Sequence, residues 1–477
     1  MTYETVIGLE VHVQMKTNTK AFCGCSTQFG QPANTQTCPV CLGLPGVLPV
    51  LNETFLQYAI RASLALNCKV ANYMKFDRKH YYYPDLPKNY QISQYDIPLA
   101  ADGYIEIDTD KGKKKIRIKR AHMEEDAGKL IHTQTASLVD LNRTGMPLLE
   151  IVTEPDISSP AEAYEYLTKL KSIIEYCEVS DCDMEKGSLR CDANISLRPD
   201  GQTELGVKTE LKNMNSFKGV RDALEYEIIR QERVLNSGET IVQETRLWDD
   251  HKQKTFSMRT KEEAHDYRYF PEPDLVPFTI TNETITAVKK DLPELPEAKK
   301  ARLVSEFEIT EYDASVISSS KHLALYFEAA AQKYKSPKTI ANWLMGDIMN
   351  YMNTNQIDAS GLGELLPVKN LINMLELIDA GTVSGKIAKK ILPEMISTQK
   401  TAPQLIKEKN LMQISDTSQL ESVIAEVITE NSSVVEDYKN GTDKALMFLV
   451  GQVMKKTRGQ ANPQMVNELI AKKVESK

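Results

Sequence analysis

Acidic, histidine and basic side chains share one face of several strands that the sequence predicts. In segment 6–14 the odd positions are apolar, so Glu10 and His12 point together from the opposite face, because successive side chains of a strand alternate. Three further segments alternate likewise, with Arg190, Asp192, Asn194 and Ser196 in 189–197, Lys208, Glu210 and Lys212 in 207–213, and Glu150 and Glu154 in 149–154. Carboxylates suit a hard divalent cation, and Arg and Lys suit phosphates. These faces therefore predict an ATP·Mg²⁺ site.

The plain alternative is that these are solvated faces of amphipathic strands. Repetition of Glu, His, Asp and Asn beside Arg and Lys across four candidate strands favours a site instead. The chain contains no G-x-x-x-x-G-K-[ST] and no G-x-G-x-x-G sequence. A P-loop or dinucleotide-binding loop is therefore excluded, and any nucleotide must bind to the sheet itself.

Four cysteines have the spacing of a metal site. Cys23 and Cys25 form one pair, and Cys38 and Cys41 form a second pair after twelve intervening residues. Two closely spaced pairs in a cytosolic chain indicate a closed tetrahedral zinc site, which holds loops in place. The alternative is four buried, reduced thiols. We expect a structural zinc ion in the loop 23–41.

Two charged segments each allow two interpretations. The stretch 111–120 has seven basic residues in ten, which fits either a solvated hairpin or contact with a phosphate backbone. The segment 121–129 carries His122, Glu124 and Glu125. It fits either an acidic turn or a part of the site.

The N-terminal elements that must position these residues are mostly strands. Period-two segments recur to about residue 280, including a hairpin with strands 104–108 and 114–119, and helices are expected at 52–66, 159–177 and 216–235. This region is predicted to be α+β with a largely antiparallel sheet.

From residue 298 the period changes to about 3.6 residues, which predicts an all-helical C-terminal region. The expected helices are 299–307, 310–319, 322–333, 337–353, 363–380, 384–397, 402–409, 416–431, 432–440, 442–457 and 462–475. We expect three parts: a catalytic domain at 1–292, a helical linker region at 293–326 and an all-helical tail domain at 327–477.

Composition supports an ordinary globular protein of 477 residues with a net charge of -8. No run approaches 18 apolar residues, and the start lacks the basic and apolar regions of a secretory signal. We expect a cytoplasmic protein that does not contact membranes. The overall acidity argues against a non-specific nucleic-acid coat, although it permits a local basic patch.

Long motifs occur at 7–14, 83–94, 122–129, 147–156, 266–274 and 448–463. Together they resemble the B subunits of bacterial glutamine-dependent aspartyl/glutamyl-tRNA amidotransferases, and the resemblance covers essentially the whole chain. It implies an N-terminal fold similar to the catalytic domain of glutamine synthetase. It also implies a heterotrimer with an amidase A subunit, which supplies ammonia from glutamine, and a small C subunit.

The resemblance implies ATP-dependent amidation of misacylated Glu-tRNA(Gln), Asp-tRNA(Asn) or both. The attached side-chain carboxyl is phosphorylated, and ammonia then displaces the phosphate. No Ser-Lys amidase signature and no convincing Cys-His nucleophile occurs in the chain, so the ammonia is expected from a partner. A non-catalytic tRNA-binding scaffold and a small-molecule carboxylate–amine ligase are the alternatives.

On this basis we expect Mg²⁺ and ATP at a defined set of residues. The expected metal ligands are Glu10, His12, Glu125 and Glu150, with Asp192 and Glu210 as additions; Lys88, Arg190 and Lys208 are expected near phosphate or the substrate carboxylate. Phosphorylation of a carboxylate brings two anions together, so cations at these positions would supply most of the catalysis.

The tail is expected to bind tRNA. Residues 439–477 carry eight basic and three acidic groups, which also fits a solvated pair of helices. The matching tail of the family grips the tRNA body, so we expect contacts from Lys444, Lys455, Lys456 and Arg458.

Overall fold

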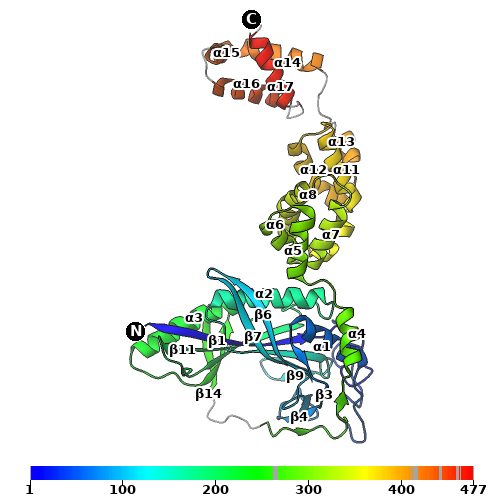
Figure 1. Cartoon of the computed structure of the whole chain (residues 1–477), viewed down its shortest axis with the longest axis vertical. Helices are drawn as coiled ribbons and strands as arrows, with labels where there is room; N and C mark the ends of the chain where they lie inside the picture. The colour runs from blue at the N-terminus through cyan, green and yellow to red at the C-terminus, as the bar shows by residue number, and fades with distance from the viewer. Residues whose placement is uncertain are drawn as a thin grey trace. The chain divides into compact units, whose positions relative to one another are not determined.

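The computed structural model describes residues 2–260, 267–409, 411, 417–439, 443–457, 461 and 463–475. The chain divides into two compact units, Met1–Pro296 and Glu297–Lys477. Figure 1 shows the first as a twisted sheet with helices and the second as helices. The expected fold class, α+β followed by a helical region, is confirmed.

The first unit is built on a nine-stranded sheet in the order β14-β13-β12-β11-β1-β10-β7-β6-β2. Its strands are β1 Tyr3–Gln14, β2 Lys69–Val70, β6 Ala100–Thr109, β7 Gly112–Glu125, β10 Pro147–Thr153, β11 Leu189–Pro199, β12 Thr209–Lys212, β13 Glu244–Asp249 and β14 Lys254–Thr260. Every neighbouring pair is antiparallel except β12 and β13, which are parallel. The sheet is therefore mixed, although largely antiparallel as expected.

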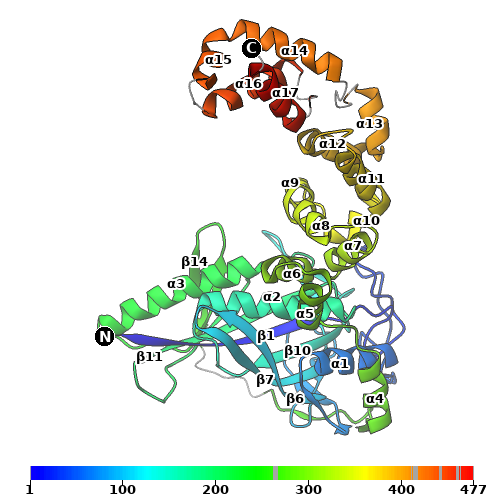
Figure 2. The ribbon, with the colours of Figure 1, turned by 45° about the horizontal axis from the view of Figure 1, so that its top comes forward.

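Three helices cover the apolar face of this sheet. They are α1 Glu53–Ala65, α2 Pro160–Tyr176 and α3 Phe217–Asn236, close to the expected bounds. Each begins where a polar side chain, Asn52, Ser159 or Ser216, accepts a hydrogen bond from the first turn. Figures 1 and 2 show α2 and α3 along the same side of the sheet. The core lies between these helices and the apolar side chains of the strands.

Alternation along β1 fixes which face is polar. Ile7, Leu9, Val11 and Val13 are buried in the core. Side chains of the other parity, including Glu10 and His12, therefore leave from the face that the three helices do not cover.

Smaller sheets complete the first unit, with orders β15-β4-β5, β16-β3 and β8-β9. Their strands are β3 Tyr73–Met74, β4 Asp77–His80, β5 Tyr90–Ser93, β8 Lys129–His132, β9 Ser137–Asp140, β15 Phe270–Pro271 and β16 Phe278–Thr279. A short helix that the sequence analysis missed, α4 Asn282–Lys290, begins where Thr281 accepts a hydrogen bond from Thr284 N–H. Among the described residues, no helix is long and apolar enough to cross a membrane.

The second unit consists mostly of helices. They are α5 Pro296–Phe307, α6 Glu311–Ser318, α7 Lys321–Ala331, α8 Pro337–Trp343, α9 Met349–Thr354, α10 Leu362–Leu365, α11 Val368–Asp379, α12 Gly385–Thr398, α13 Ala402–Glu408, α14 Thr417–Glu430, α15 Ser432–Lys439, α16 Asp443–Lys456 and α17 Pro463–Glu475. The expected helix 363–380 is interrupted at Pro367, because proline lacks an N–H and pushes the preceding residue out of helical geometry. A π-helical turn, Leu344–Ile348, interrupts the expected helix 337–353.

Candidate functional site

The register of the central strands brings the expected site residues into one row. Across β1, His12 lies opposite Arg190 of β11 on one side and Glu150 of β10 on the other. Glu150 in turn lies opposite His122 of β7. Directly opposed residues have side chains on the same face. Four strands therefore contribute to one polar surface.

Five side chains converge on this surface and form what we call the carboxylate–histidine cluster: Glu10, His12, His122, Glu124 and Glu150. His12 Nε2 lies 3.8 Å from Glu10 Oε1, 3.6 Å from Glu124 Oε1 and 3.5 Å from Glu150 Oε2. His122 Nε2 lies 3.2 Å from Glu150 Oε2. Both histidines thus lie near Glu150 and near Glu124, with the shorter distances to Glu150.

Within the cluster, glutamate and histidine charges attract each other, whereas the carboxylates of Glu10 and Glu150 repel each other. Burial alone would lower the pKa of His12, but its hydrogen bond to Glu150 and the charges of Glu150 and Glu124 raise that pKa to about 9. Burial would raise the pKa of Glu150, yet the charges of His122 and His12 hold it well below its usual value. Burial and the charge of Glu150 raise the pKa of Glu10. The cluster therefore stabilises positive charge at its centre.

The donor set fits a divalent cation. Two groups, Glu10 with His12 and Glu150, and His122 with Glu124 and Glu150, each present ligand atoms within 4.8 Å of one another. His122 Nδ1 is buried without a hydrogen-bond partner among the described residues. Carboxylate oxygens suit Mg²⁺, and a mixed set with histidine also suits softer divalent metals.

Basic residues border the cluster on the β11 and β12 side. Lys212 Nζ lies 2.7 Å from Asp192 and 3.4 Å from Glu210. Arg190 donates to Asp126 at 2.9 Å. The structure therefore brings Arg190 and Asp192 beside the cluster and ties Glu210 to it through Lys212.

Lys208 contributes differently. It is exposed just before β12 and lines a cavity of about 250 Å³. Glu10, Asn194, Ser196 and Gly206 line the same cavity. A phosphate chain could enter this cavity next to Glu10.

Glu125 and Lys88 lie apart from the cluster. Lys88 Nζ forms an ion pair with Glu125, and Ile92 N–H donates to Glu125 Oε1 at 2.9 Å. The pair lines a second cavity, which Cys23 and Cys41 also line. Glu125 follows Glu124 directly, so their side chains leave on opposite faces of β7.

The sequence analysis placed His122, Glu124 and Lys212 in candidate charged segments but did not choose them as site residues, whereas the structure puts them in or beside the cluster. Residues 121–125 belong to β7 rather than to an acidic turn. Alternation through that segment would have paired His122 with Glu124, both of which are buried. Lys212 shares the parity of Glu210, which was already a signal.

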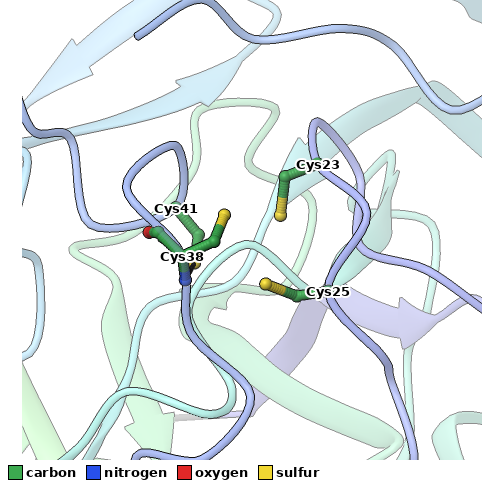
Figure 3. Close-up of side chains that lie close together, drawn as sticks. All are labelled: Cys23, Cys25, Cys38 and Cys41. Carbon is green, nitrogen blue, oxygen red and sulfur yellow. Dashed lines mark hydrogen bonds between the residues drawn. The ribbon is translucent and has the colours of Figure 1, made fainter.

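The four cysteines converge as their spacing predicted. The Sγ atoms of Cys23, Cys25, Cys38 and Cys41 lie within 4.8 Å of one another, and Figure 3 shows the two pairs approaching from separate loops. Such an arrangement could hold a metal such as zinc.

A fully buried lysine, Lys20, borders the cysteines. Its Nζ lies 3.8 Å from Cys41 Sγ and donates to Gln36 O at 2.7 Å. The hydrogen bond from Cys23, together with that from Cys38 N–H and the charge of Lys20, lowers the pKa of Cys41 to about 5. A thiolate, the form that binds metal, is therefore favoured at this position.

The tail lysines differ in their surroundings. Lys444 and Lys455 are exposed. Lys456 Nζ lies 2.9 Å from Glu426 and 2.6 Å from Glu430. Arg458, also expected to contact tRNA, lies outside the described residues.

The first unit gathers carboxylates, histidines and cations on one face of its sheet, and a helical region follows it. Such a protein is equipped for chemistry on anionic groups. Residues 5–286 match the family model described as the GatB/GatE catalytic domain, and residues 325–474 match the GatB domain. The chain belongs to the family of aspartyl/glutamyl-tRNA(Asn/Gln) amidotransferase B subunits.

Relatives in this family match over nearly their whole length. The B subunit of Carboxydothermus hydrogenoformans is 58% identical over 99% of both chains. That of Moorella thermoacetica is 55% identical over 99% of this chain and 100% of its own. That of Brevibacillus brevis is 54% identical over 98% of both.

Proposed function

We propose that this chain is the kinase and transamidase subunit of an ATP-dependent, glutamine-hydrolysing amidotransferase. Its substrate is misacylated Glu-tRNA(Gln), Asp-tRNA(Asn) or both. The γ-phosphoryl group passes from ATP to a side-chain carboxylate oxygen, and ADP leaves. Ammonia then attacks the acyl carbon, loses a proton and displaces phosphate, which leaves the amide.

The convergence of Glu10, His12, Glu124 and Glu150 carries this proposal, because these groups suit a cation between two anions. A bound Mg²⁺ would offset the repulsion between the γ-phosphate and the attacking carboxylate. His122, Asp192 and Glu210 complete or support this set. The sequence analysis gave the role of metal ligand to Glu10, His12, Glu150 and Glu125. In this proposal Glu124 takes the place of Glu125.

The basic residues orient the anions. Lys208 lies in the cavity that Glu10 lines, which suits the phosphates of ATP. We assign Arg190 and Lys212, which border the cluster, to the substrate carboxylate. For Glu125 and Lys88 the proposal changes: the buried ion pair with Lys88 and the hydrogen bond from Ile92 N–H of β5 let Glu125 hold the segment 88–92 against β7.

The remaining parts of the proposal follow from the family. We propose a heterotrimer in which an A subunit releases ammonia from glutamine and a small C subunit completes the assembly in the cytoplasm. The region 1–292 would hold the chemistry, 293–326 would link, and 327–477 would bind tRNA. Zinc at the four cysteines would be structural.

Glu150→Gln tests the catalytic assignment, since it keeps the size of the side chain but removes its charge. In the assembled complex, we expect amide formation on misacylated tRNA to fall by about 10²- to 10³-fold. Binding of tRNA should be unchanged, as a filter-binding assay would show. The matched control is Glu154→Gln, because Glu154 lies just beyond the end of β10 and, unlike Glu150, does not belong to the carboxylate–histidine cluster.

Two outcomes would favour the alternatives. Normal activity in Glu150→Gln would remove Glu150 from the reaction and support a tRNA-binding scaffold. ATP hydrolysis stimulated as strongly by free glutamate as by misacylated tRNA would instead indicate a small-molecule ligase.

A further inference from the structure

Four tyrosines form an aromatic group in the first unit, which we call the tyrosine cluster: Tyr81, Tyr95, Tyr267 and Tyr269. The rings of Tyr95 and Tyr269 stack with centroids 4.4 Å apart and planes at 11°. Tyr267 packs edge-on against Tyr269 at 6.1 Å and against Tyr81 at 6.0 Å. Tyr95 is 55% exposed and Tyr267 41% exposed. The group is therefore ordered but open to solvent.

The tyrosine cluster belongs to the face of the small sheet that borders the catalytic groups. Lys79 of β4 lies opposite Gln91 of β5, and Tyr81 Oη donates to Gln91 Oε1 at 3.2 Å. On the same face, two residues along β5, Ser93 Oγ donates to Glu124 Oε2 at 3.4 Å. One face thus carries Tyr81 and Lys79 and contacts Glu124 of the carboxylate–histidine cluster.

Charge links the two clusters as well. Burial would lower the pKa of Lys79, but the charge of Glu124, Tyr269 and the charge of Glu150 raise it. Lys79 Nζ lies 5.1 Å from the centre of the Tyr267 ring. Arg120 Nη1 donates to Tyr95 O at 3.4 Å. Cations therefore stand beside the exposed rings.

Exposed rings with cations nearby suit unpaired nucleotides, whose bases stack on aromatic faces and whose phosphates need positive charge. An acidic amino acid that is ester-linked to the end of an RNA can reach the carboxylate–histidine cluster only if the terminal nucleotide lies near that cluster. The tyrosine cluster meets both conditions.

We propose that the tyrosine cluster stacks the unpaired 3′-terminal bases of the RNA substrate and so holds the attached amino acid at the carboxylate–histidine cluster. This inference rests on the proposed function. The proposed function puts ATP elsewhere, in the cavity beside Glu10, which is lined by residues of β1, β10 and β11. The tyrosine cluster, in contrast, adjoins β7 through β5.

The test uses a hairpin RNA that ends in unpaired CCA, with 2-aminopurine as the terminal base, and the full chain in its complex. Stacking should quench the fluorescence of 2-aminopurine. Tyr95→Leu and Tyr267→Leu should each weaken binding of the hairpin by about 5- to 150-fold, the value of one aromatic stack. Tyr95→Phe keeps the ring and should retain both binding and quenching.

The controls separate the ring from general effects. Tyr312→Leu removes a tyrosine of α6 that is more exposed than Tyr95 or Tyr267, and it should change nothing. A blunt hairpin without the unpaired end should bind all variants equally. The dissociation constant of ATP, measured by equilibrium dialysis, should be the same in wild type and in both leucine variants.

Three results would overturn the inference: unchanged hairpin binding in both leucine variants, loss of ATP binding in place of hairpin binding, or loss of complex assembly with hairpin binding intact. The last result would make the tyrosine cluster a contact with another chain of the complex. Specific hairpin binding by a wild-type complex that never consumes ATP on misacylated tRNA would support the stacking site and contradict the proposed function.

Discussion

At the scale of single residues, the two candidate metal sites differ in how their charge is balanced. In the carboxylate–histidine cluster, Glu150 contacts both histidines, so acid and base offset each other within the set. The cysteine site has no such partner among its own side chains. Its counter-charge is Lys20, whose burial is tolerated because Nζ donates to Gln36 O and faces Cys41.

We therefore expect the substitution Lys20→Met to lower the affinity of the four cysteines for a metal ion. Methionine keeps most of the buried volume but removes the charge that favours the Cys41 thiolate. We expect zinc affinity to fall by about 10- to 100-fold, as for other residues that support metal ligands. Competition with a chromophoric chelator on the untagged full-length protein measures it.

The matched control for this prediction is Lys16→Met, because Lys16 is exposed in the same segment. It should leave zinc affinity unchanged. Equal affinity in Lys20→Met and wild type would show that the buried ammonium does not support the thiolates, and wild-type protein without stoichiometric zinc would end the zinc assignment.

At the scale of elements, alternation within a strand was readable from the sequence and pairing between strands was not. The parity of Glu10 and His12 depends only on β1, and both lie on the polar face as expected. The choice between Glu124 and Glu125 depended on whether residues 121–125 continue a strand, which is decided by their pairing with β10. Capping residues placed α1, α2 and α3 closely because caps are local.

Gly206 shows how one element is fitted to another. A Cβ at this position would lie 2.1 Å from Leu197 O, a backbone atom of β11 that cannot give way cheaply. Gly206→Ala should therefore cost about 1–3 kcal/mol. It should also displace the segment that contains Lys208, and Lys208 lines the cavity beside Glu10. Faster hydrogen exchange of β11 amides would report the first effect, and weaker ATP binding the second.

Gly451→Ala in α16 is the comparison for Gly206→Ala. A Cβ at Gly451 meets nothing within 4 Å, so alanine should stabilise that helix by up to about 1 kcal/mol. If Gly206→Ala exchanged as slowly as wild type and bound ATP normally, the close approach to β11 would not matter for the cavity.

At the scale of the whole molecule, charge is distributed unevenly between the parts. The chain carries -8 in total, whereas residues 439–477 carry eight basic and three acidic groups, or +5. The helices α14, α16 and α17 share a hydrophobic cluster of their own, separate from that of α5–α13. Positive charge in this group is concentrated on α16 and α17, because residues 417–438, which form α14 and most of α15, carry five acidic and no basic groups. The surface of α16 and α17 is therefore the part suited to phosphate contacts.

Lys455 and Lys456 are neighbours on α16 that should behave differently towards tRNA. Lys456 is already neutralised by Glu426 and Glu430, at 2.9 and 2.6 Å, whereas Lys455 is exposed. A phosphate contact that is lost should reduce the slope of log K against log salt by about 0.9. We therefore expect Lys455→Gln in the assembled complex to weaken tRNA binding and flatten its salt dependence, and Lys456→Gln to change both much less.

The measurement is a titration of tRNA binding at several salt concentrations. Equal slopes in wild type and Lys455→Gln would assign this surface of α16 to a role other than RNA binding.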